Sequence, residues 1–535
     1  MVTLPQLRDA KLDALDDAAS AWFRCAELFE RLEQRYARHV LAAIQHSGWT
    51  GDAADDARRR IDAQYDRLHA AAIELNNVGT ALESARETFT AAQRALRQAL
   101  DDAESGGFAV GDDGSVSWPP GHPDDQAAFR EQAEQIAERI RRALAEATRQ
   151  DESVASALRR LASAVHGIGL TDGEQEQRLA ADARLVAELA GGVDASRIPP
   201  PGTDPQRVAD WWKGLSEAER EQYLHAYPDR VGMLDGLPAV ARDEANRSLL
   251  EQRLAELRGR RDRLSGEEEK ILRGLEQIET QLERSALDPK ALPLYVLGLD
   301  TRGDGRAIVA VGNPDTAKHT AVVVPGLGTE LNDIGGQIGR ARRLARAADD
   351  MTPERGDVAA IAWLGYDAPE LHNVAGGGRA ETGAPELDRF VDGIRAVHGS
   401  EHRHVTVVGH SYGSTVVGEA AKRPGGLAAD DLIVAGSPGM RVDNIDQLQI
   451  ERRHVWAGSA EGDRVSGFLG NFSHGPEPHE KDFGANRYVV DTEGHSDYWK
   501  DNSESLRNQA RIVVGKYQEV SLEHGERPED WSPSG

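Results

Sequence analysis

The chain has 535 residues, more than one ordinary hydrophobic core supports, so we expect two or three domains. Its 63 lysines and arginines against 90 aspartates and glutamates give a net charge of −27. A charge of that sign repels phosphate backbones, which argues against nucleic acid as a partner. Cys25 is the single cysteine, so an intrachain disulfide and a cysteine-based zinc site are excluded.

Residues 1–20 contain no basic start followed by an apolar run, so we expect no Sec signal peptide. No stretch approaches the roughly 18 consecutive apolar residues that a membrane-spanning helix needs. The expected location is therefore the cytoplasm. The alternative is export by a route other than Sec.

Residues 1–105 are predicted to form a helical hairpin. One apolar stripe of helical spacing runs from Leu12 to Leu32, and a second amphipathic run extends over about residues 53–103. The glycine-containing segment HSGWTGDAADD separates the two runs, as the turn of an αα-hairpin does.

The turn residues Trp49, Thr50 and Gly51 resemble those of the WXG-type hairpins associated with type VII secretion. The resemblance implies two long helices joined at this turn, and a second copy or a type VII secretion component as partner. We expect Trp49 to be packed in a structural role. The family's usual export tag, Tyr-x-x-x-Asp/Glu just past the second helix, is absent. That spacing occurs instead at Tyr366 and Glu370, in an expected loop.

Residues 106–287 are predicted to form a further helical region. The Gly- and Pro-punctuated stretch 106–120 indicates a small β-hairpin, and helical patterning resumes over about residues 124–166. Three consecutive prolines mark a linker over residues 197–205. Leucines and isoleucines then recur at near-heptad steps from Leu250 to Leu282, which indicates a long helix or a helical hairpin.

Residues 288–520 are predicted to form a catalytic α/β domain, followed by a flexible tail over residues 521–535. Short apolar runs alternate with helical stretches at about residues 329–348, 384–397 and 412–422. Such runs are typical of strands buried on both faces of a parallel sheet, so we expect a doubly wound, mainly parallel sheet. The turn TRGDGR joins the first two strands and predicts an antiparallel pair at that edge. The runs are PLYVLGLD, RAIVAVGN, HTAVVVPGLG, VAAIAWLGYD, HVTVVGHS, DLIVAGSPG and RHVWAGS.

The run HVTVVGHSYGST places Ser411 between two glycines, after a predicted strand and before a predicted helix. Gly-x-Ser-x-Gly in that context is typical of a nucleophile elbow, whose glycines leave room for a strained serine backbone. Ser437 also ends a strand between small residues, but Pro438 follows it and has no N–H to donate to an oxyanion. We therefore predict that Ser411 is the nucleophile and that Ser437 lies in a structural turn.

An elbow serine needs a base and an orienting acid, which α/β-hydrolases have in the chain order serine, acid, histidine. Asp463 follows the end of the run RRHVWAGSA, and His495 lies in a loop before the last predicted helix, so both positions fit. Glu461 precedes Asp463 in the same loop and competes for the role of acid. His474 and His479 precede the final strand, which is the wrong side for the base.

Two backbone N–H groups are expected to bind the oxyanion. One belongs to Tyr412, directly after the nucleophile, and the other to Leu327 in the turn Pro-Gly-Leu-Gly. Gly326 and Gly328 lack the third glycine of a dinucleotide loop, and GHSYGST lacks the lysine of a phosphate loop. No metal or organic cofactor is expected.

Several stretches of the chain resemble a family of bacterial α/β-hydrolases, largely uncharacterised, that have a helical segment ahead of the catalytic domain. The resemblance spans roughly residues 208–515 and implies an α/β-hydrolase fold. It implies the elbow serine at Ser411, the late histidine at His495 and the acid at Asp463, but no particular substrate. The stretches are VADWWKGLSEAEREQYLHAYPDRVGMLDGLPAVARDEANR, VVVPGLGT, WLGYDAPE, VVGHSYGST, GSPG and HGPEPHEKDFGANRYVVDTEGHSDYW.

Together these patterns predict a serine hydrolase that cleaves an ester, thioester or amide bond of a small-molecule or lipid-like acyl substrate. The Gly-rich segment 363–388 is expected to form part of the pocket rim or a lid, with a surface loop as the alternative. The competing hypothesis is an interaction or export-linked protein, in which the hairpin docks a partner and the hydrolase fold is degenerate.

Overall fold

The computed structural model describes residues 2–41, 43–44, 49, 51–118, 126–164, 182, 186, 195–288, 290–369, 378–463 and 474–523. The chain divides into two compact units, residues 1–197 and residues 198–535. The boundary lies at the proline-containing segment that the sequence marks as a linker. The expected helical region 106–287 is thereby divided between the two units.

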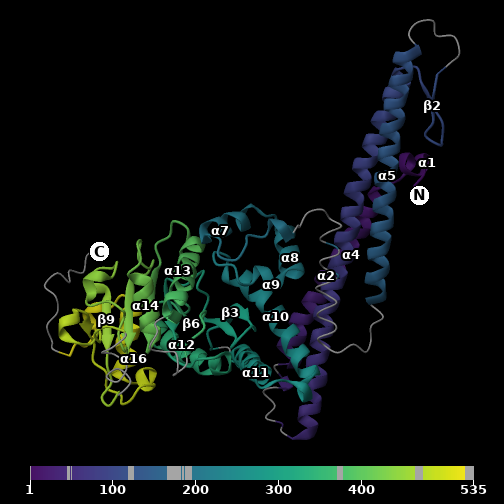
Figure 1. The fold of residues 1–535 in the computed structure, drawn as a ribbon. Helices are drawn as coiled ribbons and strands as arrows, with labels where there is room; N and C mark the ends of the chain where they lie inside the picture. The colour runs from purple at the N-terminus through teal and green to yellow at the C-terminus, as the bar shows by residue number, and fades with distance from the viewer. Residues whose placement is uncertain are drawn as a thin grey trace. The chain divides into compact units, whose positions relative to one another are not determined.

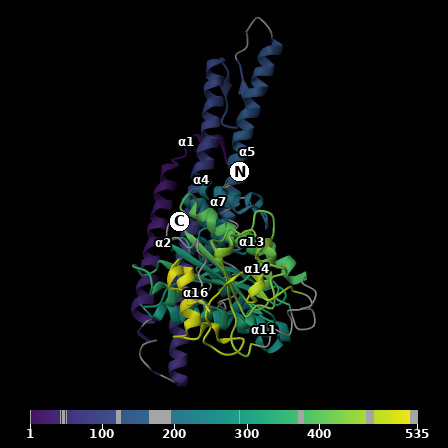
Figure 2. The same ribbon diagram turned by 90° about the vertical axis from the view of Figure 1, so that its left-hand side faces the viewer.

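The first unit consists mainly of long helices. Both α2 and α5 pack along α4, and the helices run side by side in Figure 1 and in the turned view of Figure 2. Its core contains Leu96 and Ile140, which are fully buried between α4 and α5. The elements are α1 (Leu4–Asp9), α2 (Asp13–Tyr36), the π-helix η1 (Ala37–Leu41), α4 (Asp52–Ser105), the antiparallel pair β1 (Ala109–Val110) and β2 (Val116–Ser117), and α5 (Gln126–Ala164).

The predicted helices on either side of the Trp49 turn are present, as α2 with η1 and as α4. Trp49 itself is 45% exposed, so the expectation that it is packed is wrong. Gly51 has a φ of +104°, which allows the chain to enter α4 abruptly. Thr50 lies outside the described residues. None of the described helices is both long and apolar enough to cross a membrane.

The second unit begins with helices that pack on the sheet. The near-heptad pattern from Leu250 to Leu282 forms a helical hairpin, α10 and α11, as predicted. Ser265 begins α11 with a capping box, in which its hydroxyl accepts from the N–H of Glu268 and the Glu268 carboxylate accepts from the N–H of Ser265. The helices are α7 (Pro205–Gly214), α8 (Glu217–Ala226), α9 (Pro228–Val231), α10 (Ala239–Gly259) and α11 (Gly266–Leu287).

An eight-stranded sheet follows, in the order β10-β9-β8-β7-β5-β6-β4-β3. The predicted doubly wound, mainly parallel sheet is confirmed, since β10 to β6 pair in parallel and only β4 and β3 are antiparallel to their neighbours. Its strands are β3 (Leu294–Asp300), β4 (Arg306–Val311), β5 (His319–Val324), β6 (Val358–Leu364), β7 (His404–His410), β8 (Asp431–Ala435), β9 (Val455–Gly458) and β10 (Asn486–Arg487).

The strands from β3 to β9 contribute alternate side chains to two cores. Val323 and Val408 face the core that holds α12 (Ile334–Asp349) and α16 (Glu504–Val513), whereas Val322 and Val407 face the core that holds α13 (Gly378–His398) and α14 (Gly413–Ala421). Figure 1 shows these helix pairs on opposite sides of the sheet. Burial on both faces explains why the strands have continuous apolar runs.

The loop within the glycine-rich segment 363–388 is shorter than the composition of the segment predicts. Helix α13 already begins at Gly378, six residues before the predicted start at residue 384. Ala380, Ala384 and Leu387 are buried on its inner face, so packing offsets the low helix propensity of the glycines. Residues 370–377 of the expected rim or lid lie outside the described residues, and its role stays a prediction.

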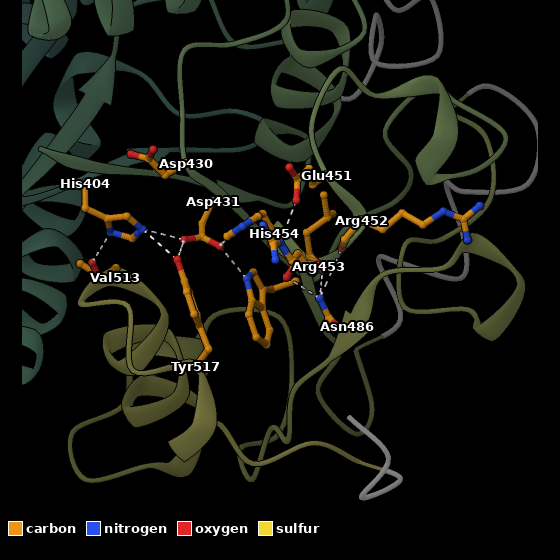
Figure 3. Close-up of polar contacts among 12 residues, drawn as sticks. His404, Asp430, Asp431, Glu451, Arg452, Arg453, His454, Asn486, Val513 and Tyr517 are labelled. Atoms are coloured by element: carbon orange, nitrogen blue, oxygen red, sulfur yellow. Dashed lines mark hydrogen bonds and ion pairs between the residues drawn. The ribbon is translucent and has the colours of Figure 1, made fainter. Parts of the chain in front are cut away.

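A buried carboxylate ties the amino ends of β7 and β8 to the last helical turn. Asp431 Oδ2 accepts from His404 Nε2 at 2.8 Å and from the Tyr517 hydroxyl at 2.6 Å. Asp431 Oδ1 accepts from His454 Nδ1 at 2.9 Å and from Trp456 Nε1 at 3.0 Å. Figure 3 shows the carboxylate between these groups. Burial raises the pKa of Asp431, but hydrogen bonds from both histidines outweigh it and hold the pKa below its usual value.

His404 is positioned as an imidazolium. Its Nδ1 lies 2.8 Å from the carbonyl oxygen of Val513 and its Nε2 faces Asp431, so both ring nitrogens donate to acceptors (Figure 3). Burial lowers the pKa of His404, but the hydrogen bond to Asp431 and the carboxylate's charge give a net rise. The His319 ring lies edge-on to it, with a pKa lowered to about 4 by burial and by the charge of His404, and stays neutral.

We predict that replacing His404 by Gln removes a pH-dependent part of the stability. Because the folded-state pKa of His404 is raised, its contribution is complete below the unfolded pKa of about 6.5 and is lost as pH rises through the folded value. His404→Gln should lower the free energy of unfolding by about 1–3 kcal/mol at pH 6, and the loss should shrink towards pH 9. Denaturant unfolding followed by tryptophan fluorescence measures both effects.

His402→Gln is the matched control, because the His402 side chain is 78% exposed. This substitution should change the free energy of unfolding by less than about 0.5 kcal/mol. A difference between wild type and His404→Gln that stays constant from pH 6 to pH 9 would contradict the imidazolium assignment.

Candidate active site

Ser411 occupies the sharp turn between β7 and α14, and its backbone is strained. Its φ is +53°, in the left-handed region that residues with a β-carbon seldom adopt. The N–H of Ser411 donates to the carbonyl of Ala435 at the end of β8, at 3.0 Å, which fixes the turn to the neighbouring strand. Such an outlier is typical of functional sites.

The glycines around Ser411 make the strained turn sterically possible. A β-carbon at Gly409 would lie 2.6 Å from Ser414 Cα, and one at Gly413 would lie 2.3 Å from the carbonyl oxygen of Val324. A β-carbon at Gly326 would lie 2.6 Å from Ser411 Cβ and 3.0 Å from its Oγ. The loop after β5 is therefore packed directly against Ser411, which requires a glycine at position 326.

Asp463 and His495 form a hydrogen-bonded pair. His495 Nδ1 donates to the Asp463 carboxylate, at 2.9 Å from Oδ1 and 3.0 Å from Oδ2. The Asp463 side chain is fully buried, whereas that of His495 is 24% exposed. Asp463 therefore lies where it can fix the tautomer of the ring and leave Nε2 available for a proton.

The competing candidates do not take part in the hydrogen bond between Asp463 and His495. Glu461 is exposed, and its carbonyl accepts from the N–H of Gly494 at 3.1 Å. His479 Nε2 lies 2.8 Å from Glu523 Oε1. His474 is fully buried with its ring edge-on to Tyr412, at a centroid distance of 5.5 Å.

Ser437 lies in a structural turn of the second unit. Its hydroxyl accepts from Ser414 Oγ at 2.6 Å and from the N–H of Gly439 at 3.1 Å. The contact with Ser414 holds the turn after β8 against the start of α14, and the contact with Gly439 closes the turn itself. They leave the hydroxyl buried and occupied, which disfavours Ser437 as a nucleophile.

The sequence analysis missed Tyr498, which contacts the acid. Its hydroxyl donates to Asp463 Oδ2 at 2.7 Å and accepts from the N–H of Ala460 at 3.0 Å. Burial and the hydrogen bond to Asp463 raise the pKa of Tyr498, so the hydroxyl keeps its proton. No sequence motif marks this contact, because it joins the loop after β9 to a residue that lies 35 positions further on.

His410, directly before the nucleophile, positions the backbone of His495. Its Nε2 donates to the carbonyl oxygen of His495 at 2.8 Å, and its Nδ1 lies 3.4 Å from Arg340 Nη1. Burial, followed by the charges of Arg340 and His495, lowers the pKa of His410 to about 3. The ring is therefore neutral, with the proton on Nε2, and lies against the His495 ring at a centroid distance of 4.8 Å.

The two expected oxyanion donors lie on either side of Ser411. Tyr412 follows it in the chain, and the turn with Leu327 is held by a hydrogen bond of 2.9 Å from the N–H of Gly328 to the carbonyl of Pro369. Within the described ranges, neither the Tyr412 nor the Leu327 N–H has a protein acceptor. Their role as oxyanion donors stays a prediction.

Three candidate residues therefore lie at the carboxyl edge of the sheet, with His410 as their link. Within the part of the chain that the structure describes, Ser411 Oγ makes no hydrogen bond, and Ser411 is 4% exposed. The hydrogen bond between a nucleophile and its general base is often long in ligand-free enzymes and shortens on substrate binding. Among the same residues, no three His, Cys, Asp or Glu side chains converge as metal ligands.

Comparison with known proteins gives the family. Residues 300–473 match a family model described as "Alpha/beta hydrolase". "Uncharacterized protein Rv2079" of Mycobacterium tuberculosis is 29% identical over 89% of this chain and 84% of its own length. "Uncharacterized protein Mb0988c" of Mycobacterium bovis is 34% identical over 32% of this chain and 68% of its own length. The chain belongs to this α/β-hydrolase family.

The α/β-hydrolase match covers most of the candidate site. It begins at the end of β3, contains Ser411 and Asp463, and ends before His495. A third relative, "Uncharacterized protein Rv2077c" of M. tuberculosis, is 33% identical over 22% of this chain and 35% of its own length. The similarity to Rv2079 spans too much of the chain to be confined to the second unit, so that relative also shares part of the helical unit.

We predict that Gly413→Ala destabilises the elbow. Its β-carbon would meet backbone oxygen atoms of Val324 and Pro325 at 2.3 and 2.7 Å, and neither can move without shifting β5. The free energy of unfolding should fall by about 1–3 kcal/mol or more, as measured by urea denaturation. Gly336→Ala on α12, where a β-carbon meets nothing within 4 Å, should be neutral or stabilising by up to about 1 kcal/mol. Equal stability of the two variants would contradict the steric argument.

Proposed function

We propose that the protein is a serine hydrolase that cleaves an ester, thioester or amide bond through an acyl-enzyme. The observation that supports this most is the strained Ser411 at the elbow, beside a buried carboxylate that holds a histidine by Nδ1. The substrate would be a small-molecule or lipid-like acyl compound.

In the proposed reaction, Ser411 Oγ attacks the substrate carbonyl carbon while His495 Nε2 takes the hydroxyl proton. Asp463 accepts from His495 Nδ1 and stabilises the imidazolium that forms. The N–H groups of Tyr412 and Leu327 donate to the oxyanion, and the collapsing intermediate expels the leaving group, which takes the proton from His495. Water then attacks the acyl-enzyme in the same manner. The steps need neither a metal nor an organic cofactor.

Tyr498 and His410 would support this chemistry without touching the substrate. The Tyr498 hydroxyl donates to Asp463, which favours the ionised carboxylate. His410 is neutral beside His495 and so adds no positive charge that would oppose formation of the imidazolium. Both are positioning residues in this proposal.

A second candidate function is protein docking by the first unit. Helix α2 leaves Trp22, Leu28 and Leu32 exposed, at 38%, 53% and 44%, and large apolar groups of this kind are typical of interaction surfaces. The resemblance of Trp49 and Gly51 to a WXG-type turn supports a second copy of the hairpin or a type VII secretion component as the partner. The hydrolase unit would then be an accompanying or degenerate domain.

We predict that a fluorophosphonate probe labels the wild-type chain and that Ser411→Ala abolishes the labelling. The probe reacts only with an activated serine hydroxyl, and the substitution removes that hydroxyl alone. Intact-mass spectrometry measures the adduct, and circular dichroism should be unchanged. Ser437→Ala is the matched control and should be labelled like the wild type.

Labelling that persists in Ser411→Ala would move the nucleophile to another serine. A wild-type chain that is folded but not labelled would contradict the hydrolase proposal and leave docking by the first unit as the better account.

We predict that Asp463→Asn lowers turnover by roughly 10³–10⁴-fold without unfolding the protein, because the amide favours the wrong imidazole tautomer. Hydrolysis of a p-nitrophenyl ester of a short acyl chain measures the effect. Glu461→Gln, two residues earlier in the same loop, is the control. It should keep normal turnover because Glu461 is exposed. Near-normal activity of Asp463→Asn together with a large loss in Glu461→Gln would transfer the role of acid to Glu461.

A further inference from the structure

A cavity of about 670 Å³ lies in the second unit, away from Ser411. It is lined by the segment before β3, the second half of α12, the loop before β6 and Asp501. The start of β6 and the end of β4 meet at the amino edge of the parallel strands, since Val311 pairs with Ala360. Ser411 follows the other end of β7 and is not among the residues that line the cavity.

The cavity is lined by five cationic and four acidic side chains, a slight positive excess in a chain whose net charge is −27. Three arginines come from the last two turns of α12, a fourth from the loop before β6 and a lysine from the segment before β3. Four carboxylates also line the cavity. The cations are Lys290, Arg342, Arg343, Arg346 and Arg355, and the acids are Asp288, Asp349, Asp350 and Asp501.

Two of the four acids are committed to backbone groups. Asp349 accepts from the N–H of Gly356 at 2.9 Å and from that of Val358 at 3.3 Å, and so holds the loop before β6. Asp288 accepts from the N–H of Lys290 at 2.9 Å within its own turn. These hydrogen bonds explain both carboxylates as parts of the local backbone structure.

Asp501 is shared between two arginines at long range. It lies 3.6 Å from Arg343 Nε and 3.8 Å from an Nη of Arg346, which exceeds the length of a charge-assisted hydrogen bond. Asp350 is exposed at the end of α12. Asp501 therefore pairs with Arg343 and Arg346 by charge, without a short hydrogen bond to either.

Arg342 gives the strongest indication that the cavity binds an anion. One of its Nη atoms is buried and has no hydrogen-bond acceptor among the described residues, and the same residues form no ion pair with it. Burial, together with the charges of Arg284 and Arg343, lowers the pKa of Arg342. A buried guanidinium nitrogen without an acceptor is costly, so an external anion would stabilise this arrangement.

The dipole of α12 does not account for the position of all four arginines that line the cavity. Cations near a helix C-terminus are stabilised within its last turn, which explains Arg346. Arg342 and Arg343 lie one turn earlier, and Arg355 lies beyond the helix in the loop before β6. The helix dipole therefore does not explain why these four arginines line one cavity.

We propose that this cavity binds a small soluble molecule that carries a phosphate or pyrophosphate group. Arg342 and Arg346 are four residues apart and share a face of α12, and Arg343 lies three residues from Arg346. Planar guanidinium groups that approach from several sides match the three free oxygen atoms of a phosphate better than the two of a carboxylate. The volume exceeds that of the phosphate group and lies within the range of ligand sites, which leaves room for an organic moiety.

Isothermal titration of the full chain with inorganic pyrophosphate tests the proposal. We expect saturable binding with one site per chain, and a dissociation constant raised about tenfold or more in Arg342→Gln. Arg355→Gln is a second variant at an exposed loop position, and it should weaken binding without affecting the fold. Arg253→Gln on α10 is the control and should bind like the wild type, because Arg253 is 44% exposed, pairs with Glu256 and does not line the cavity.

No binding of pyrophosphate at millimolar concentration would overturn the proposal, as would unchanged affinity in both Arg342→Gln and Arg355→Gln. Equal affinity for citrate would overturn the assignment to phosphate. Ser411→Ala should bind pyrophosphate like the wild type, because Ser411 is not among the residues that line the cavity. A loss of binding in that variant would contradict their independence.

Discussion

The left-handed backbone of Ser411 is the constraint around which the second unit is arranged. A φ of +53° at a residue with a β-carbon is unfavourable by itself, so the surrounding structure must determine it. Here the N–H of Ser411 is bonded to β8, while Gly413 is pressed against the end of β5 and Gly326 against the serine side chain. Central strands that are buried on both faces make this enclosure rigid, because neither core can relax without disturbing the other. The strained turn therefore depends on the whole sheet.

The parts of the fold that follow from local patterns are those that the sequence predicts. Apolar runs give the strands from β3 to β9, and the strand–glycine–helix context around Ser411 gives the elbow. Asp463 and His495 are predicted because their order in the chain and their positions after strands are topological properties. Their hydrogen bond confirms that the two side chains meet, whereas their roles in catalysis stay predictions.

Long-range hydrogen bonds and tertiary packing escape sequence analysis. Tyr498 and Asp463 meet only because the loop before α16 folds back on the loop after β9. The start of α13 at Gly378 is similarly non-local, since the N–H of Ala380 in its first turn donates to the Tyr412 hydroxyl at 3.2 Å. Trp49 shows the opposite error, because a short motif predicts packing that a residue 45% exposed does not have. The contacts of Tyr498 and of Ala380 join residues that no periodicity relates.

Helix α16 connects the two edges of the sheet. At its C-terminal end, the carbonyl of Val513 accepts from His404, which belongs to the buried cluster around Asp431. At its N-terminal end, Asp491 accepts from the first N–H groups of the helix, and Ser505 and Gln509 both donate to the carbonyl of Tyr498. The loop that holds His495 is thus closed by one end of a helix whose other end is fixed by the imidazolium–carboxylate pair. Helix α16 therefore links, through hydrogen bonds at its two ends, the loop that holds His495 and the buried carboxylate at the opposite edge of the sheet.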